Sequence, residues 1–188
     1  MKIHFLILAL FASICVSLNA QSGVVLAAGV SMAYTENPAT SAKGQFISGY
    51  HGSLTGRLGA DNWYLRPGIE LHKMKLLPKK ILDPFSDDPS MYLLKFPAQI
   101  GVRLLKKDNF NVRIAGGLQF TYTVSVQKNS LDLDLNTITE NQFGALIGAG
   151  MDLGVMTIDV NFEKGLTELY KGKGYKADYI FVTAGFLF

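Results

Sequence analysis

The sequence predicts an all-β protein, a single antiparallel, up-and-down transmembrane β-barrel of about eight strands. The clearest observation is residues 110–126 (FNVRIAGGLQFTYTVSV), where apolar and polar positions alternate for about seven repeats. This segment is much longer than an ordinary strand, which has about 5 to 6 residues. It is long enough to cross a bilayer at a tilt, which takes about 9 to 11 residues. The same alternation recurs along the chain, and the connections are alternately short and long.

Residues 1–20 are predicted to be a secretory signal peptide that lies outside the fold. Lys2 precedes an apolar run that ends in Leu18-Asn19-Ala20, the pattern of a cleaved leader. The only cysteine, Cys15, lies in this run, so residues 21–188 are expected to form one barrel domain without a disulfide. No later segment has the about 18 consecutive apolar residues of a membrane helix.

Charge gives no support for nucleic acid as a partner. The chain has 18 Lys and Arg residues against 15 Asp and Glu residues, without a long basic run. An exported chain of this composition is either a soluble exported protein or an outer-membrane barrel.

Two-faced strands are predicted in order at residues 23–34, 50–59, 63–72, 92–104, 110–126, 142–153, 155–163 and 179–188. Each has one apolar parity, which alternates with polar or small residues. The apolar parity includes Val24, Leu26 and Val30 in the first strand; Tyr50 and Leu54 in the second; Trp63, Leu65 and Ile69 in the third; Phe96 and Ile100 in the fourth; Val112 and Leu118 in the fifth; Phe143 and Ile147 in the sixth; Ile158 and Val160 in the seventh; and Ile180 and Val182 in the last.

The connections favour a membrane barrel. In order they are long (35–49), short (60–62), long (73–91), short (105–109), long (127–141), very short (around Gly154) and long (164–178). Bacterial membrane barrels have short periplasmic turns, longer extracellular loops and an even strand number. The pattern therefore predicts that the chain begins and ends in the periplasm.

Matching the polar parities of neighbouring strands predicts the hairpin registers. A turn around residues 60–61 would place His51 opposite Glu70. A turn at residues 153–154 would keep Asp152 and Val155 on one face.

Two prolines conflict with a regular ladder. Pro67 and Pro97 fall within predicted strands, where each removes a ladder hydrogen bond. We expect a β-bulge at each.

A soluble lipocalin-like carrier would show the same alternation with the apolar side chains turned inward. The polar parity argues against this arrangement, because it is rich in glycine and alanine and has almost no lysine. With about eight strands, the lumen is just wide enough for side chains to fill. We therefore predict a packed polar lumen without an open pore, in which acidic groups partner the arginines. Its predicted members are His51, Arg57, Arg66, Glu70, His72, Arg103, Arg113, Asp152, Asp159 and Glu163.

Several segments carry a family resemblance. They are Tyr92-Leu93-Leu94-Lys95-Phe96-Pro97, the Gly116-Gly117 strand, GALIGAG at 144–150, DVNFEKGL at 159–166, and the ending AGFLF at 184–188. With these segments the chain resembles the outer-membrane β-barrel domain family of the Bacteroidota, which includes the PorT-like proteins. The resemblance implies insertion by the barrel-assembly machinery, with Tyr179, Phe186 and Phe188 in the terminal strand as the assembly signal. It also allows a role as an accessory component of a secretion apparatus.

Catalytic and metal sites receive little support from the sequence. His51, His72, Glu70 and Ser53 could form a hydrolase site in a lipid-modifying barrel enzyme, but an interior hydrogen-bond network explains them better. The histidine and cysteine spacing does not match a zinc site, and no cofactor is expected.

We therefore expect a non-enzymatic outer-membrane protein with a structural or surface-interaction role through its extracellular loops. Outer-membrane lipid is the expected partner. The loop lysines either pair with lipopolysaccharide phosphates or form a solvated surface. They are Lys73, Lys75, Lys79, Lys80, Lys128, Lys171, Lys173 and Lys176. The sequence does not indicate an oligomeric state or a physiological process.

Overall fold

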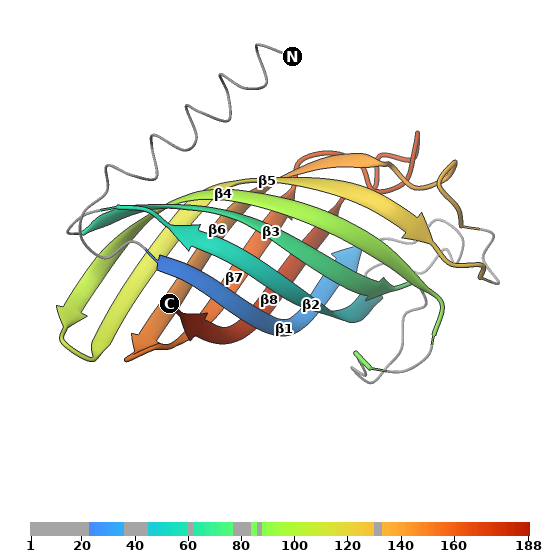
Figure 1. The fold of residues 1–188 in the computed structure, drawn as a ribbon. Helices are drawn as coiled ribbons and strands as arrows, with labels where there is room; N and C mark the ends of the chain where they lie inside the picture. Colours follow the sequence, from blue (N-terminus) through green and yellow to red (C-terminus); the bar gives the residue numbers. More distant parts are fainter. Residues whose placement is uncertain (1–22, 36–44, 60–61, 77–83, 86–87, 130–132) are drawn as a thin grey trace, which may run out of the picture.

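Eight antiparallel strands pair in sequence order and close into a barrel in the computed structural model of the protein (Figure 1). The structure describes residues 23–35, 45–59, 62–76, 84–85, 88–129 and 133–188. The strands are β1 (Gly23–Thr35), β2 (Gln45–Arg57), β3 (Trp63–Lys75), β4 (Ser90–Lys107), β5 (Phe110–Val126), β6 (Asn141–Leu153), β7 (Met156–Gly165) and β8 (Ala177–Leu187). The predicted all-β, up-and-down fold is confirmed. The predicted signal peptide lies outside the described residues.

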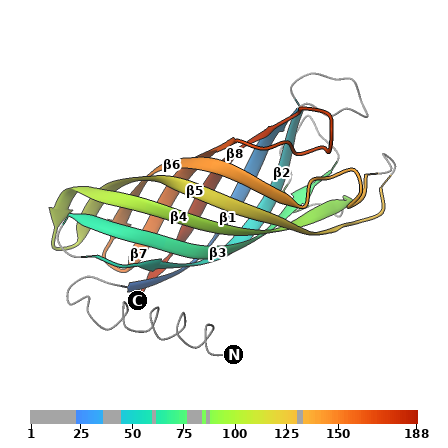
Figure 2. The ribbon, with the colours of Figure 1, turned by 90° about the horizontal axis from the view of Figure 1, so that it is seen from above.

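Short turns lie at one end of the barrel and long connections at the other (Figures 1 and 2). The β4–β5 turn contains only Asp108 and Asn109, and the β6–β7 turn only Gly154 and Val155. The chain end at Phe188 lies at the short-turn end (Figure 1), in agreement with the predicted alternation. No helix in the described part of the chain is long and apolar enough to span a membrane.

Side chains alternate between an apolar outer wall and a largely polar interior. In β5, Leu118 is 60% exposed whereas Gln119 is 1% exposed. The same contrast holds in β3, where Ile69 is 51% and Arg66 is 4% exposed. The apolar parity therefore faces outward, which is the reverse of a lipocalin-like cavity.

The predicted register of β2 and β3 is wrong by two residues. His51 lies opposite His72, and Glu70 lies opposite Ser53. A shift of two residues keeps every side chain on its own face, so the parity of the sequence cannot distinguish the two registers.

The predicted β6–β7 turn is displaced by one residue. Leu153 pairs with Met156, and Asp152 lies opposite Thr157 rather than on one face with Val155. Gly154 has a φ of 60°, a left-handed conformation that glycine adopts readily and that tight hairpins require.

The bulges expected at the two prolines are absent. The β3–β4 register is the same at Pro67↔Ala98 and Glu70↔Lys95, so pairing is interrupted between them without a shift. The register shifts of the β4–β5 ladder occur elsewhere, at Tyr92/Leu93 and Arg103/Leu105. A missing N–H removes one ladder bond, and here the barrel tolerates that loss locally.

The sequence predicts a polar interior, but part of the interior is apolar. Near the long connections, inward residues of the strands and residues of two loops form an apolar cluster, which we call the apolar cap. Its members are Ala33, Ile47, Met74, Leu76, Met91, Leu93, Leu133, Ile138, Leu169, Tyr170 and Ala177. The charged residues predicted for the lumen lie in the middle and at the short-turn end of the barrel. Beside the apolar cap, the buried polar residues include Thr123, which lies opposite Leu93, and Gln142, whose Nε2 is 3.3 Å from Thr123 Oγ1.

The corrected register can be tested by cross-linking in a Cys15→Ser chain. Cysteines at Tyr50 and Lys73, which lie opposite each other on the outer wall, are expected to form a disulfide, because directly opposed Cβ atoms are about 4.5–5.5 Å apart. Cysteines at Tyr50 and Leu71, opposite in the predicted register, should cross-link much less. Non-reducing electrophoresis of the folded barrel measures both, and the reverse result would restore the original register.

Candidate functional site

The ten residues predicted to form a polar lumen all lie on the inner parity of their strands. Nine are buried and Glu70 is half-buried. They do not form one network. They divide into a cluster of arginines and aspartates near the short turns and a histidine-containing layer in the middle of the barrel.

Three arginines from one side of the barrel meet two aspartates from the other. Arg57 Nη1 donates to both Asp152 oxygens at 2.9 Å, and Arg66 binds both oxygens of Asp159 at 3.2 and 3.1 Å. Arg113 contacts both carboxylates. Because buried charges must be paired, this arginine cluster joins β2, β3 and β5 to β6 and β7 through the interior.

Glycine on β6 makes room for this cluster. A Cβ atom at Gly150 would lie 2.7 Å from the Arg113 guanidinium carbon. At Gly144 it would lie 2.6 Å from Glu163 Cγ. The small residues of the sixth predicted strand therefore leave space that long side chains of the neighbouring strands β5 and β7 fill.

Arg103 lies beside an aromatic ring at the same end. Its guanidinium carbon is 5.3 Å from the Tyr64 ring centroid, within the range of a cation–π contact. The Tyr64 ring in turn lies over Gly101, where a Cβ atom would be 2.5 Å from Tyr64 Cε1.

A buried ion pair lies in the middle layer. Lys95 Nζ donates to Glu163 Oε2 at 2.5 Å and lies 3.8 Å from the Tyr179 ring centroid and 4.9 Å from that of Phe181. Lys95 was absent from the predicted network, although it was the one lysine on the inner parity of a predicted strand. The ion pair links β4 to β7.

The two histidines lie in a continuous row of hydrogen bonds. His51 Nε2 is 2.9 Å from Thr183 Oγ1, and His51 Nδ1 is 2.8 Å from Ser31 Oγ. Ser31 Oγ is also 3.1 Å from His72 Nδ1, and His72 Nε2 is 2.9 Å from Glu70 Oε2. Ser31 and Thr183 were not among the predicted members of the lumen network, although both lie on the inner parity of their strands.

The geometry of this row does not resemble an accessible catalytic site. His51 is 3% exposed and His72 is not exposed, and the serine that joins them is Ser31 rather than the predicted Ser53. A hydrolase needs its nucleophile and base in reach of substrate. In the described part of the chain, no group of three or more His, Cys, Asp or Glu side chains could hold a metal ion.

Two loops close the barrel above this layer. The β5–β6 and β7–β8 connections pair through Ile138 and Tyr170, and Thr139 N donates to Leu169 O at 2.9 Å. Burial in the apolar cap raises the pKa of Tyr170 to about 12. Side-chain and backbone hydrogen bonds from Asn136 and Thr137 lower the pKa of Asp134 in the exposed turn of the first loop.

The three residues of the predicted assembly signal do not share a face. Phe186 and Phe188 are 50% and 78% exposed, whereas Tyr179 is 2% exposed and lies under Lys95. Only the two phenylalanines are displayed to the outside. Recognition by an assembly machinery remains a prediction.

No family model matches the sequence, and no curated protein matches it. Among solved structures, the chain is similar to Neisserial surface protein A, with 10% identity over 90% of this chain and 100% of that chain and a TM-score of 0.57. It is also similar to Ail, the attachment invasion locus protein of Yersinia pestis, with 11% identity over 90% of this chain and 100% of that chain and a TM-score of 0.50. At these identities the likeness shows the fold.

The importance of the arginine cluster can be measured with Asp152→Asn. This change keeps the size of the side chain but removes the charge between Arg57 and Arg113, so we expect a loss of about 3–5 kcal/mol in unfolding free energy. Lys164→Gln is the matched control, because it breaks an ion pair whose lysine is 61% exposed and should cost at most about 1 kcal/mol. Denaturant unfolding of the folded barrel measures both, and similar losses would contradict a structural role for the cluster.

Proposed function

We propose that the protein is a small outer-membrane β-barrel without enzymatic activity, which acts through the loops at its long-connection end. The observation that carries this proposal is the inside-out distribution of side chains. Apolar residues cover the outer wall, whereas paired charges fill the interior. Water cannot stabilise such a wall, but hydrocarbon can.

The height of the apolar wall fits a bilayer. On β3 the outward residues are apolar from Trp63 to Leu71, and Lys73 follows them. The eight residue steps from Trp63 to Leu71, of about 3.3 Å each and tilted by about 40°, span about 20 Å, and the ten steps to Lys73 span about 25 Å. The apolar band of outer-membrane barrels is about 25 Å tall.

Aromatic and charged groups mark the loop-side edge of this wall. Tyr34 and Phe46 contact each other at 5.2 Å between ring centroids, and Tyr50 stacks on Phe85 at 5.6 Å. Lys73 Nζ lies 5.8 Å from the Tyr50 ring centroid. Amphipathic rings and lysines of this kind are typical of the membrane interface, where lipid phosphates are available as partners.

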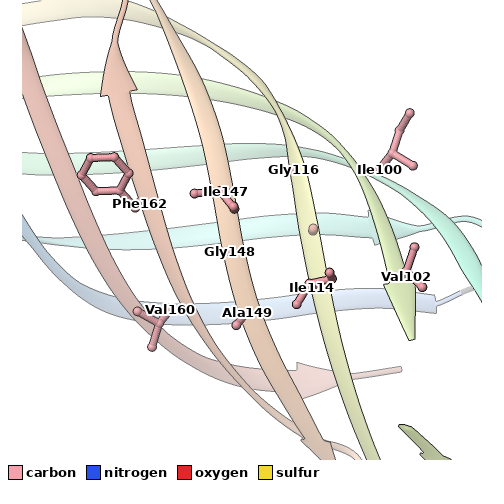
Figure 3. A pocket seen from close by; sticks show the side chains of 10 residues that line it. Ile100, Val102, Ile114, Gly116, Ile147, Gly148, Ala149, Val160 and Phe162 are labelled. Atoms are coloured by element: carbon pink, nitrogen blue, oxygen red, sulfur yellow. The ribbon is translucent and has the colours of Figure 1, made fainter. Parts of the chain in front are cut away.

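The wall also carries a shallow apolar groove (Figure 3). It has a volume of about 500 Å³ and spans β4 to β7, with Gly116 and Ala149 between the larger side chains of Ile100, Ile147 and Phe162. Its lining contains no charged residue, so it suits acyl chains better than a soluble ligand.

The interior supports neither a carrier nor a small-solute pore. Ion pairs occupy the middle and the short-turn end, and the apolar cap closes the other end. This leaves the loops as the surface for interaction. The name of the Yersinia pestis neighbour describes attachment, and that of the neisserial neighbour a surface protein, which supports a surface role for this chain.

A second candidate is an accessory role in a secretion apparatus, which the sequence resemblance to PorT-like proteins favours. Stable co-purification with a large envelope assembly would support it over an independent surface role. Insertion by the barrel-assembly machinery and contact with lipopolysaccharide are part of the proposal in either case.

Contact of the wall with lipid predicts a depth-dependent effect of charge. Leu118→Arg, near the middle of β5, should destabilise the barrel in lipid vesicles by about 2–4 kcal/mol. Leu135→Arg, in the β5–β6 loop, should change the unfolding free energy by at most about 0.5 kcal/mol. Equal effects in a urea titration would indicate that water, and not lipid, covers the wall.

The proposed location and orientation can be tested by cysteine labelling in a Cys15→Ser chain. Leu135→Cys at the loop end and Val155→Cys at the short-turn end are both in exposed positions. A membrane-impermeant maleimide added to intact cells should label only the first, and both after lysis. Labelling of the second alone would reverse the orientation, and a chain in the soluble fraction would refute the membrane location.

A further inference from the structure

The row from Thr183 to Glu70 crosses the seam at which the barrel closes. Thr183 belongs to β8, His51 to β2, Ser31 to β1, and His72 and Glu70 to β3. Every link is a side-chain hydrogen bond of 2.8 to 3.1 Å. The imidazole rings are stacked, with centroids 4.5 Å apart and planes 15° apart. The row therefore couples the two histidines both through Ser31 and through space.

The donor and the acceptor of each hydrogen bond can be assigned by starting from the Glu70 carboxylate at one end of the row. An ionised Glu70 only accepts, so His72 must carry a proton on Nε2. If His72 is neutral, its Nδ1 is an acceptor and takes the one proton of Ser31. The Ser31 oxygen must then accept from His51 Nδ1–H, and His51 Nε2 accepts from the Thr183 hydroxyl. The neutral row thus requires opposite tautomers at the two histidines.

One added proton gives a second complete pattern. If His51 Nε2 takes up the proton, the Nδ1 proton of His51 can pass to Ser31, and the Ser31 proton to His72 Nδ1. The result is an imidazolium at His72, which donates to Glu70 and to Ser31. Ser31 then donates to His51 Nδ1, and His51 Nε2–H donates to Thr183. Every bond along the row between Thr183 and His72 is reversed, the contact with Glu70 is kept, and the net charge rises by one.

A second proton has no such pattern. With both Nδ1 atoms protonated, the Ser31 hydroxyl has no histidine acceptor, and two imidazolium rings would stack at 4.5 Å. The charged groups in this layer are Glu70 on β3, Lys95 on β4 and Glu163 on β7, and Tyr179 on β8 is also titratable. Together they carry a net charge of −1, counting Glu70 (−1), Glu163 (−1) and Lys95 (+1). Arg66 and Asp159 also interact with Glu70, but they form an ion pair without net charge. One proton neutralises the layer, and a second would make it positive.

We propose that Thr183, His51, Ser31, His72 and Glu70 form a buried site for a single proton, which switches between these two hydrogen-bond patterns. In this second pattern the added proton resides on His72, because both of its ring nitrogens then face an acceptor, Nδ1 the Ser31 hydroxyl oxygen and Nε2 the Glu70 carboxylate. The site rests on the interior geometry alone and is independent of the membrane location.

Nitrogen-15 NMR of histidine-labelled full-length chain folded in micelles tests this directly. The sequence has three histidines, so His4→Gln leaves only His51 and His72. At pH 7.5 we expect a proton on Nδ1 of His51 and on Nε2 of His72. On acidification, one imidazolium should appear at His72, and the proton of His51 should move from Nδ1 to Nε2 over the same pH range.

Two variants separate the row from general effects of acid. Ser31→Ala removes the link, so His72 should take up its proton without a tautomer change at His51. Thr157→Val, in the arginine cluster, should leave the titration of both histidines as in the parent chain. Identical tautomers at pH 7.5, two imidazolium signals in the folded barrel, or proton uptake by Glu70 with both imidazoles neutral would each overturn the proposal. These outcomes are read in the parent chain, even if a variant does not fold.

Discussion

Closure of β1 against β8 is the constraint on which the rest of the structure depends. The β1–β8 ladder runs from Val25↔Leu187 to Thr35↔Ala177 and leaves the sheet without a free edge. Each strand residue then has only two environments, the outer wall or the interior. The neighbours of an arginine on the inner parity separate it from bulk water, so it needs a partner inside the barrel. Arg57, Arg66 and Arg113 pair with carboxylates, and Arg103 lies beside the Tyr64 ring.

The same constraint explains the uneven distribution of small residues. A closed eight-stranded ring has a fixed and narrow interior, so a long side chain on one strand requires space on another. Arg113 lies against Gly150, Glu163 against Gly144, and Tyr64 over Gly101. Glycine is thus used here for its volume, whereas at Gly154 it is used for its backbone conformation. A barrel filled in this way has little freedom to open a channel.

The alternation of the sequence was sufficient to predict the strands, their faces and the ends at which they turn. It could not predict the strand registers, which can shift by two residues without moving any side chain to the other face. It also could not predict which interior residues lie at the same height along the barrel. The β2–β3 register and the position of the β6–β7 turn were wrong for this reason. Moving the β6–β7 turn by one residue changes the partner of Asp152 by two residues, and a shift of two residues leaves every side chain on the same face. Several strands also begin before or end after the predicted bounds, as β2 does by beginning at Gln45, because the ladder continues where the apolar pattern has stopped. The inner positions were predicted, but their partners across the lumen were not, and the apolar cap depends on loop residues such as Leu133 and Leu169 that carry no periodic signal.

The apolar cap also bears on how the loops could recognise a partner. Long loops usually lose conformational entropy when they bind, and this loss weakens the complex. Here the β5–β6 and β7–β8 loops are paired through Ile138 and Tyr170, and Asp134 fixes a turn through hydrogen bonds from Asn136 and Thr137. In the described residues of these two loops, 127–129, 133–140 and 166–176, inward side chains belong to the barrel's own core. The shape of this part of the outer surface is therefore set by folding. A surface built in this way is ordered before any partner arrives, which favours recognition by fixed shape and charge over recognition by loop rearrangement.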